Sequence, residues 1–151
     1  MNRRVKIYLL VVALGGALLS GCMGFWGSDR SIATKVEITQ DWTGIPIEPA
    51  INAKYRQQYI SLEIPNIKWD AKFDAIYLED GTTLMPELEL VDEHGNVQRL
   101  RLSGRVRKNS VKAVFRPAED LEKGRNFTMV RIRSDVPFRC NEMMWVDYDP
   151  K

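Results

Sequence analysis

Cysteine and histidine are scarce in this chain of 151 residues, which has two Cys and one His. So few thiols exclude a domain held by several disulfides, and His94 has no sequence neighbour with which to form a metal site or a catalytic triad. Glycine-rich phosphate-binding loops are absent. No charge-free apolar run reaches the roughly 20 residues of a membrane-spanning helix, which excludes a polytopic membrane protein.

The remaining composition is that of an ordinary globular protein. Hydrophobic residues make up 44% and charged residues 28% of the chain, which excludes wholesale disorder and a collagen-like repeat. The length is typical of one domain. A mature domain of about 130 residues is large enough to bury its own core without disulfides.

The first residues have the organisation of a secretion signal. Arg3, Arg4 and Lys6 give a positively charged start, and residues 7–19 follow without a charge. A run of 13 residues is too short to cross the hydrocarbon core of a bilayer as a helix. The segment therefore indicates a signal peptide over residues 1–21 rather than a permanent anchor.

The signal ends at a motif that resembles the lipobox of bacterial lipoproteins, in which an aliphatic and two small residues precede a cysteine. The motif is Leu19-Ser20-Gly21-Cys22. The resemblance implies cleavage between Gly21 and Cys22, diacylglycerol on the nucleophilic Cys22 sulfur, and acylation of the new amino terminus with a fatty acid such as palmitate. The alternatives are an ordinary signal peptide with an incidental cysteine, or an uncleaved helix.

This resemblance predicts a protein whose first partner is a bacterial membrane, because two or more acyl chains hold a protein firmly in a bilayer. Met23 follows the cysteine, where an aspartate would signal retention in the inner membrane of enteric bacteria. The expected location in a Gram-negative host is the periplasmic face of the outer membrane. Residues 22–33 are predicted to form a lipidated tether, and residues 34–151 the folded domain.

Removal of the signal changes the charge balance. Of the 22 Lys and Arg residues, three lie in residues 1–21, which hold no acid. The mature chain therefore has 19 basic and 20 acidic residues, a net charge of −1, which gives no support for nucleic acid as a partner. Lipidation of Cys22 would leave Cys140 alone, either as a buried small residue or as a reactive or intermolecularly bridged thiol.

From Thr34 onward, short runs alternate hydrophobic and polar residues between turn signals, which predicts about eight strands. The runs are 36–38, 60–64, 73–78, 84–91, 97–102, 111–115, 127–133 and 140–146. Helical features are confined to residues 50–59 and 117–124, the latter with Pro and acids early and Lys and Gly late.

The hairpin around Gly95 can be predicted in register. A type I turn followed by a left-handed glycine places Asp92 opposite Asn96. The same register pairs leucines on one face and acids with arginines on the other, as a half-buried hairpin requires. The facing residues are Leu88 and Leu100, Glu89 and Arg99, and Glu87 and Arg101.

The closing stretch has a regular strand over 127–133, a turn with Ser134, Asp135 and Pro137, and an apolar strand through Trp145. It resembles the end of discoidin-like and galactose-binding-like jelly rolls. Together with the number of short strands, it predicts an all-β fold, an antiparallel β-sandwich of jelly-roll type after an N-terminal signal helix. Such a fold does not by itself fix the function.

Two features are candidate ligand sites. Trp69 lies in a predicted loop beside charged residues, which suits stacking on a sugar ring, although it can equally cover the end of the core. Residues 22–98 hold 6 basic and 13 acidic side chains, whereas residues 99–139 hold 12 and 4. This asymmetry indicates either a basic face for phosphate groups or acidic glycans, with Arg105 and Arg107 at its rim, or pairing between the two parts of the chain.

Catalysis has little support in the sequence. The acid pairs Asp70/Asp74 and Asp147/Asp149 lack a neighbouring group that marks a tuned acid or base. We therefore predict that the protein is not an enzyme and uses neither metal nor cofactor. The predicted function is a lipid-anchored, non-catalytic binding or scaffold module for another envelope component. The alternative is a carbohydrate-binding module that uses the loop tryptophan and the two rim arginines.

Overall fold

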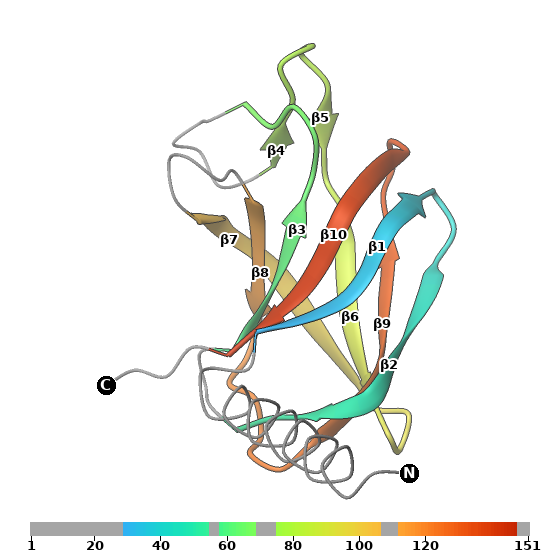
Figure 1. Ribbon diagram of the computed structural model, residues 1–151, viewed down its shortest axis with the longest axis vertical. Helices are drawn as coiled ribbons and strands as arrows, with labels where there is room; N and C mark the ends of the chain where they lie inside the picture. Colours follow the sequence, from blue (N-terminus) through green and yellow to red (C-terminus); the bar gives the residue numbers. More distant parts are fainter. Residues whose placement is uncertain (1–28, 55–57, 69–74, 107–111, 148–151) are drawn as a thin grey trace, which may run out of the picture.

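A computed structural model describes residues 29–54, 58–68, 75–106 and 112–147 (Figure 1). The predicted signal segment and lipobox lie outside these residues. Within them the chain is all-β, as the sequence predicts. No helix in the described ranges combines the length and the apolar character that a membrane crossing requires.

Eight strands form the main sheet, and two short ones form a separate hairpin. The main strands are β1 (Arg30–Ile38), β2 (Thr43–Asn52), β3 (Tyr59–Glu63), β6 (Glu87–Asp92), β7 (Val97–Val106), β8 (Lys112–Pro117), β9 (Asn126–Arg133) and β10 (Phe138–Val146). The hairpin of β4 (Ile76–Tyr77) and β5 (Thr83–Leu84) is inserted between β3 and β6.

The strand pairing is nested, so that early strands pair with late ones. β1 pairs with β10, β2 with β9, β3 with β8 and β6 with β7, all antiparallel. The sheet order is β1-β10-β3-β8-β7-β6-β9-β2, and the sheet curls until it nearly forms a barrel (Figure 1). The two halves of this order are the two layers of a jelly roll, which confirms the predicted fold class.

The sheet passes from one layer to the other between β8 and β7. There β7 contains a bulge between Leu102 and Gly104, and Gly104 has a φ of 133°. A bulge bends its strand and increases the local twist, and a glycine adopts this φ without the strain that a side chain would cause. On one side of this bulge β7 pairs with β6 through Val97–Leu100, and beyond it β7 continues to pair with β8.

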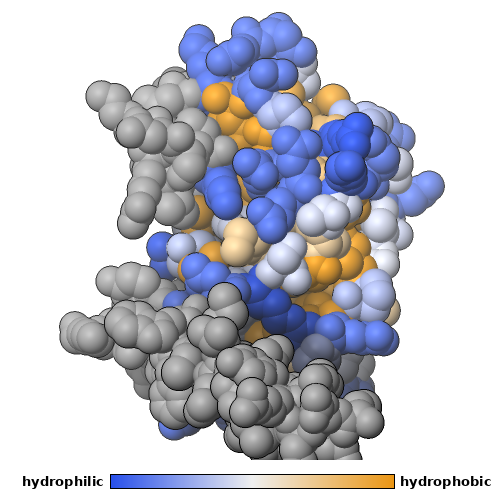
Figure 2. Space-filling view, in the orientation of Figure 1, coloured by the Kyte–Doolittle hydropathy of each residue, from blue (hydrophilic) through white to orange (hydrophobic). Residues whose placement is uncertain are grey.

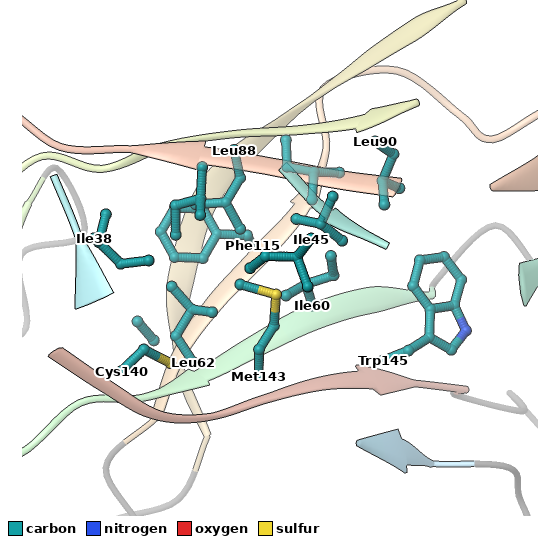
Figure 3. Packing of buried hydrophobic residues seen from close by; sticks show 14 of the residues in the cluster. Ile38, Ile45, Ile60, Leu62, Leu88, Leu90, Phe115, Cys140, Met143 and Trp145 are labelled. Atoms are coloured by element: carbon teal, nitrogen blue, oxygen red, sulfur yellow. The ribbon is translucent and has the colours of Figure 1, made fainter. Parts of the chain in front are cut away.

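The core fills the space between the two layers (Figure 3). Leu88 and Leu90 of β6 face Leu62 and Met143 of the opposite layer, and all four are 1% exposed or less. Trp145 and Cys140 are buried in the same core, as expected for the apolar last strand. The side of the molecule formed by β1, β10 and β3 shows hydrophilic residues over much of its described surface, with hydrophobic ones between them (Figure 2).

Several local predictions were wrong. The predicted tether of residues 22–33 is too long, because β1 begins at Arg30, and Ile32 and Ala33 pack against the core. The domain therefore starts before Thr34. The predicted single strand 84–91 is divided by Met85 and Pro86, which belong to neither β5 nor β6.

The two helical predictions were also wrong where the structure describes them. Residues 50–52 belong to β2, and residues 118–124 form bends and a turn. Gly124 donates its amide hydrogen to the carbonyl of Ala53 at 2.9 Å, so this loop is fixed to the end of β2. β2 was not predicted because Pro46 and Pro49 interrupt its alternation; β2 tolerates them as an edge strand.

Both ends of the domain lie on one side of the fold. Arg30 is paired with Trp145, and the amide of Asp147 donates a hydrogen bond to the Asp29 carboxyl at 3.2 Å. The β6–β7 turn and the 118–125 loop lie at this same end, because the strands alternate in direction. We call it the Asp29 end; the β4–β5 hairpin lies at the opposite end (Figure 1).

Candidate functional site

The outer side of β7, β6 and β9 carries a concentration of charged groups. Leu88 and Leu90 point into the core, so the residues that alternate with them point outward. The register aligns both acids of β6 with arginines of β9, and one of the acids also with Arg99 of β7; Arg101 lies two residues further along β7. We call this set the arginine face: Glu87, Glu89, Arg99, Arg101, Arg131 and Arg133.

The two acids are paired mainly with β9. Both carboxylate oxygens of Glu87 accept hydrogen bonds from Nη2 of Arg133, at 3.0 and 3.1 Å. Glu89 is 7% exposed and accepts a short hydrogen bond from Nη2 of Arg131. The predicted Glu89–Arg99 pair is present at 3.8 Å, whereas the ion-pair partner of Glu87 is Arg133 rather than Arg101.

Trp42 fixes the two β9 arginines from outside. The guanidinium carbons of Arg133 and Arg131 lie 4.6 and 5.2 Å from the centre of its ring. Each cation–π contact at a partly exposed site contributes about 0.5–1 kcal/mol. Trp42 is half-buried in the loop before β2, and its ring contacts both arginines and restrains their positions.

The β7 arginines are the charged groups of this face that remain available. The Arg99 side chain is 82% exposed, and its one ion pair with a described acid is the 3.8 Å contact with Glu89. Arg101 is exposed and lies opposite Arg116 of β8. Among the described residues, no acid forms an ion pair with Arg101. Two guanidinium groups with little internal compensation therefore face solvent side by side.

A groove runs over β6 and β7 across these groups. Its first part has a volume of about 730 Å³ and is lined by Met85, Glu87, Arg101 and Asp135, among others. Its second part, about 540 Å³, shares Glu89, Arg99, Arg101 and Ala118 with the first and extends to Val97, Gln98 and Glu119. Because the parts share residues, they form one elongated depression. The exposed apolar residues Met85 and Val97 lie toward its two ends.

Asp92 fixes the β6–β7 turn at the Asp29 end. Its carboxylate accepts hydrogen bonds from the amides of His94 and Asn96, at 2.9 and 2.8 Å, and from Nη2 of Arg125 at 3.0 Å. Burial by itself raises the pKa of this carboxyl, but the hydrogen bonds from Asn96, His94 and Arg125 outweigh it and lower the pKa to about 2. Gly95 has a φ of 82°, so the turn has the predicted left-handed glycine.

The sequence-predicted site residues fall mostly outside the described part of the chain. The residues outside it are Gly21, Cys22, Trp69 and Arg107. Arg105 is in β7, opposite Ala113. The acids Asp70, Asp74 and Asp149 are also outside it. Asp147 is described, and its carboxylate accepts hydrogen bonds from Nε1 of Trp145 at 2.8 Å and from Gln58.

The common site formed by Trp42, Arg131 and Arg133 was not predicted from the sequence. The charge asymmetry was the available signal. Of its two interpretations, pairing between the two parts of the chain is confirmed for the described ion pairs between arginine and acid. Each of them joins an acid of residues 22–98 to an arginine of residues 99–139. Arg101 is among the described, exposed arginines that this pairing leaves without an acid.

The described residues outside the groove include a buried cysteine and scattered metal-binding side-chain types. Burial raises the pKa of the Cys140 thiol to about 11, and its Sγ lies 3.1 Å from the carbonyl oxygen of Glu142. Within the described ranges, no three His, Cys, Asp or Glu side chains come together as a set that could hold a metal ion. No family model, curated protein or solved structure matches the chain.

Proposed function

We propose that this chain is a lipid-anchored protein of the bacterial cell envelope whose jelly-roll domain is a non-catalytic binding module. The lipobox-like motif carries the anchoring part of the proposal. Cys22 precedes Asp29, where the described domain begins, by seven residues, and a chain of that length spans roughly 25 Å at most. Lipids on Cys22 would therefore hold the Asp29 end of the domain close to the membrane surface.

The groove over β6 and β7 supports the binding part. It presents exposed arginines on a rigid sheet, with the β9 arginines fixed by ion pairs and by Trp42. Rigid elements position a binding surface better than mobile loops do. The groove follows β6 and β7, which run between the Asp29 end and the opposite end. In an anchored domain the groove would therefore lie on the side of the domain, open to another envelope component.

Membrane fractionation of cells that express the chain tests the anchoring. The wild-type protein and Cys140→Ala are expected in the membrane fraction, because Cys140 is buried in the core and takes no part in anchoring. Cells are also fed labelled palmitate. Cys22→Ala is expected to incorporate no label and to remain as the unprocessed precursor. Wild-type protein without incorporated labelled palmitate, or equal labelling of Cys22→Ala, would contradict the proposal.

A carbohydrate-binding module is the second candidate function. The observation in its favour is the close mixture of hydrogen-bond donors and acceptors along the groove, which includes Arg99, Glu89, Gln98 and Glu119. A sugar hydroxyl both donates and accepts a hydrogen bond, so it can use both kinds of group.

A further inference from the structure

We propose that the groove over β6 and β7 binds a linear glycan that carries carboxylate groups. This inference rests on the proposed function and names the ligand of the binding module. The three observations that support it are the mixture of donors and acceptors, the surplus positive charge on β7, and the elongated shape of the groove.

The mixture of donors and acceptors selects for hydroxyl groups. Arg99 and Arg101 offer only donors, whereas Glu87, Glu89 and Glu119 offer only acceptors, and both kinds line the same depression. A ligand with acceptors alone, such as a fully ionised phosphate group, has no hydrogen to donate to the acids of the groove. A polyhydroxylated chain satisfies both kinds of group at neighbouring positions.

The surplus charge selects for an acidic member of this class. Glu87 and Glu89 are occupied by Arg133 and Arg131, so their charges are largely compensated within the fold. Arg99 and Arg101 are not compensated to the same degree. The exposed acids Asp135 and Glu119 each line only one of the two parts of the groove, whereas Arg99 and Arg101 line both, so a ligand carboxylate would bind where the two parts meet. A guanidinium group can bind a carboxylate through two parallel hydrogen bonds, which adds both energy and geometric selectivity.

The shape of the groove selects for a chain over a single sugar. β6 has six residues, and at a rise of about 3.3 Å per residue the floor is about 20 Å long. Met85 is 59% exposed and Val97 is 46% exposed, and both line the groove. Isolated apolar side chains in a polar groove provide contacts for the C–H faces of sugar rings. A peptide would instead need enclosed apolar pockets to anchor its side chains.

Titration calorimetry on the mature full-length lipoprotein in detergent micelles tests this assignment. The acidic probes are hexasaccharides of galacturonate, mannuronate and hyaluronate; cellohexaose is the neutral glycan, and hexaglutamate is the acidic peptide. We expect at least one acidic hexasaccharide to bind, with cellohexaose and hexaglutamate each weaker by about tenfold or more. The double variant Arg99→Gln/Arg101→Gln is expected to reduce that affinity by about tenfold or more.

Arg139→Gln is the matched control. Arg139 is a half-exposed arginine of β10 that pairs with Glu37 at 3.7 Å, away from the groove. This variant should bind the glycan as the wild type does. A circular dichroism spectrum and an unfolding midpoint for every variant separate loss of binding from loss of fold.

The remaining outcomes overturn the assignment. Absence of binding by all three acidic hexasaccharides, or equal binding of hexaglutamate, rejects an acidic glycan as the ligand. Binding that is retained in the arginine double variant also rejects this groove as the site. These outcomes leave the fractionation result untouched, so failure of the ligand assignment is distinguishable from failure of the anchoring.

Discussion

Replacement of Leu90 by alanine tests the orientation of β6, on which the groove depends. Leu90 is completely buried between the layers and lies opposite Gln98, whereas Val97 of the same hairpin is 46% exposed in the groove. The residue period of a strand is two, so a slip of one residue would exchange the core face with the groove face. Leu90 and Val97 therefore serve as an inward and an outward probe of one register.

The expected magnitude follows from the atoms removed. Leu90→Ala deletes three buried carbon atoms, which corresponds to about 2.4 kcal/mol of transfer free energy at about 0.8 kcal/mol each. The cavity left in the core adds to this, so the free energy of unfolding should fall by about 2.5–5 kcal/mol. Val97→Ala, at a surface position, should change it by no more than about 0.5 kcal/mol.

Urea unfolding followed by tryptophan fluorescence measures both variants. Because Trp145 is buried in the same core, its emission reports the loss of packing between the layers. The slope of free energy against urea should stay constant, so that the midpoints report stability. Equal losses in the two variants, or a larger loss for Val97→Ala, would refute the register and place the charged residues of β6 in the core.

Two further predictions concern titratable groups. The Cys140 thiol, with a pKa raised to about 11 by burial, should resist a maleimide reagent in the native protein and react rapidly in urea; rapid native labelling would contradict its burial. The pKa of Asp92 is lowered from 3.8 to about 2, so its stabilising contribution is complete above 3.8 and is lost as the pH falls toward 2. Unfolding midpoints between pH 5 and 2 should therefore depend less on pH in Asp92→Asn than in the wild type, and identical profiles would show that another group dominates.

Local patterns in the sequence predicted much of the fold. The β6–β7 register could be predicted because the turn chemistry of Asp92 and Gly95 and the alternation of the flanking residues agree. β2 could not, because its two prolines remove the strand signal that its edge position makes tolerable. The helical features of 117–124 gave way to contacts with the distant Ala53, which a local pattern does not contain.

The candidate site was less predictable because it is assembled from distant segments. Glu89 and Arg131 are separated by 42 residues, and Trp42 lies still further from the arginines that it contacts. The charge asymmetry indicated that such pairs exist, but it did not specify their partners. Only the nested strand order brings β9 beside β6 and so decides which arginines are compensated and which remain exposed.

Mass spectrometry of the intact protein, extracted from the membranes of the native host, tests the central claim most directly. The account predicts a polypeptide that begins at Cys22 and carries the added mass of diacylglycerol on that residue, with a further acyl chain on its amino group if the host completes the modification. A species that retains residues 1–21, or one that begins elsewhere with an unmodified Cys22, would contradict the anchoring and the membrane location inferred from it.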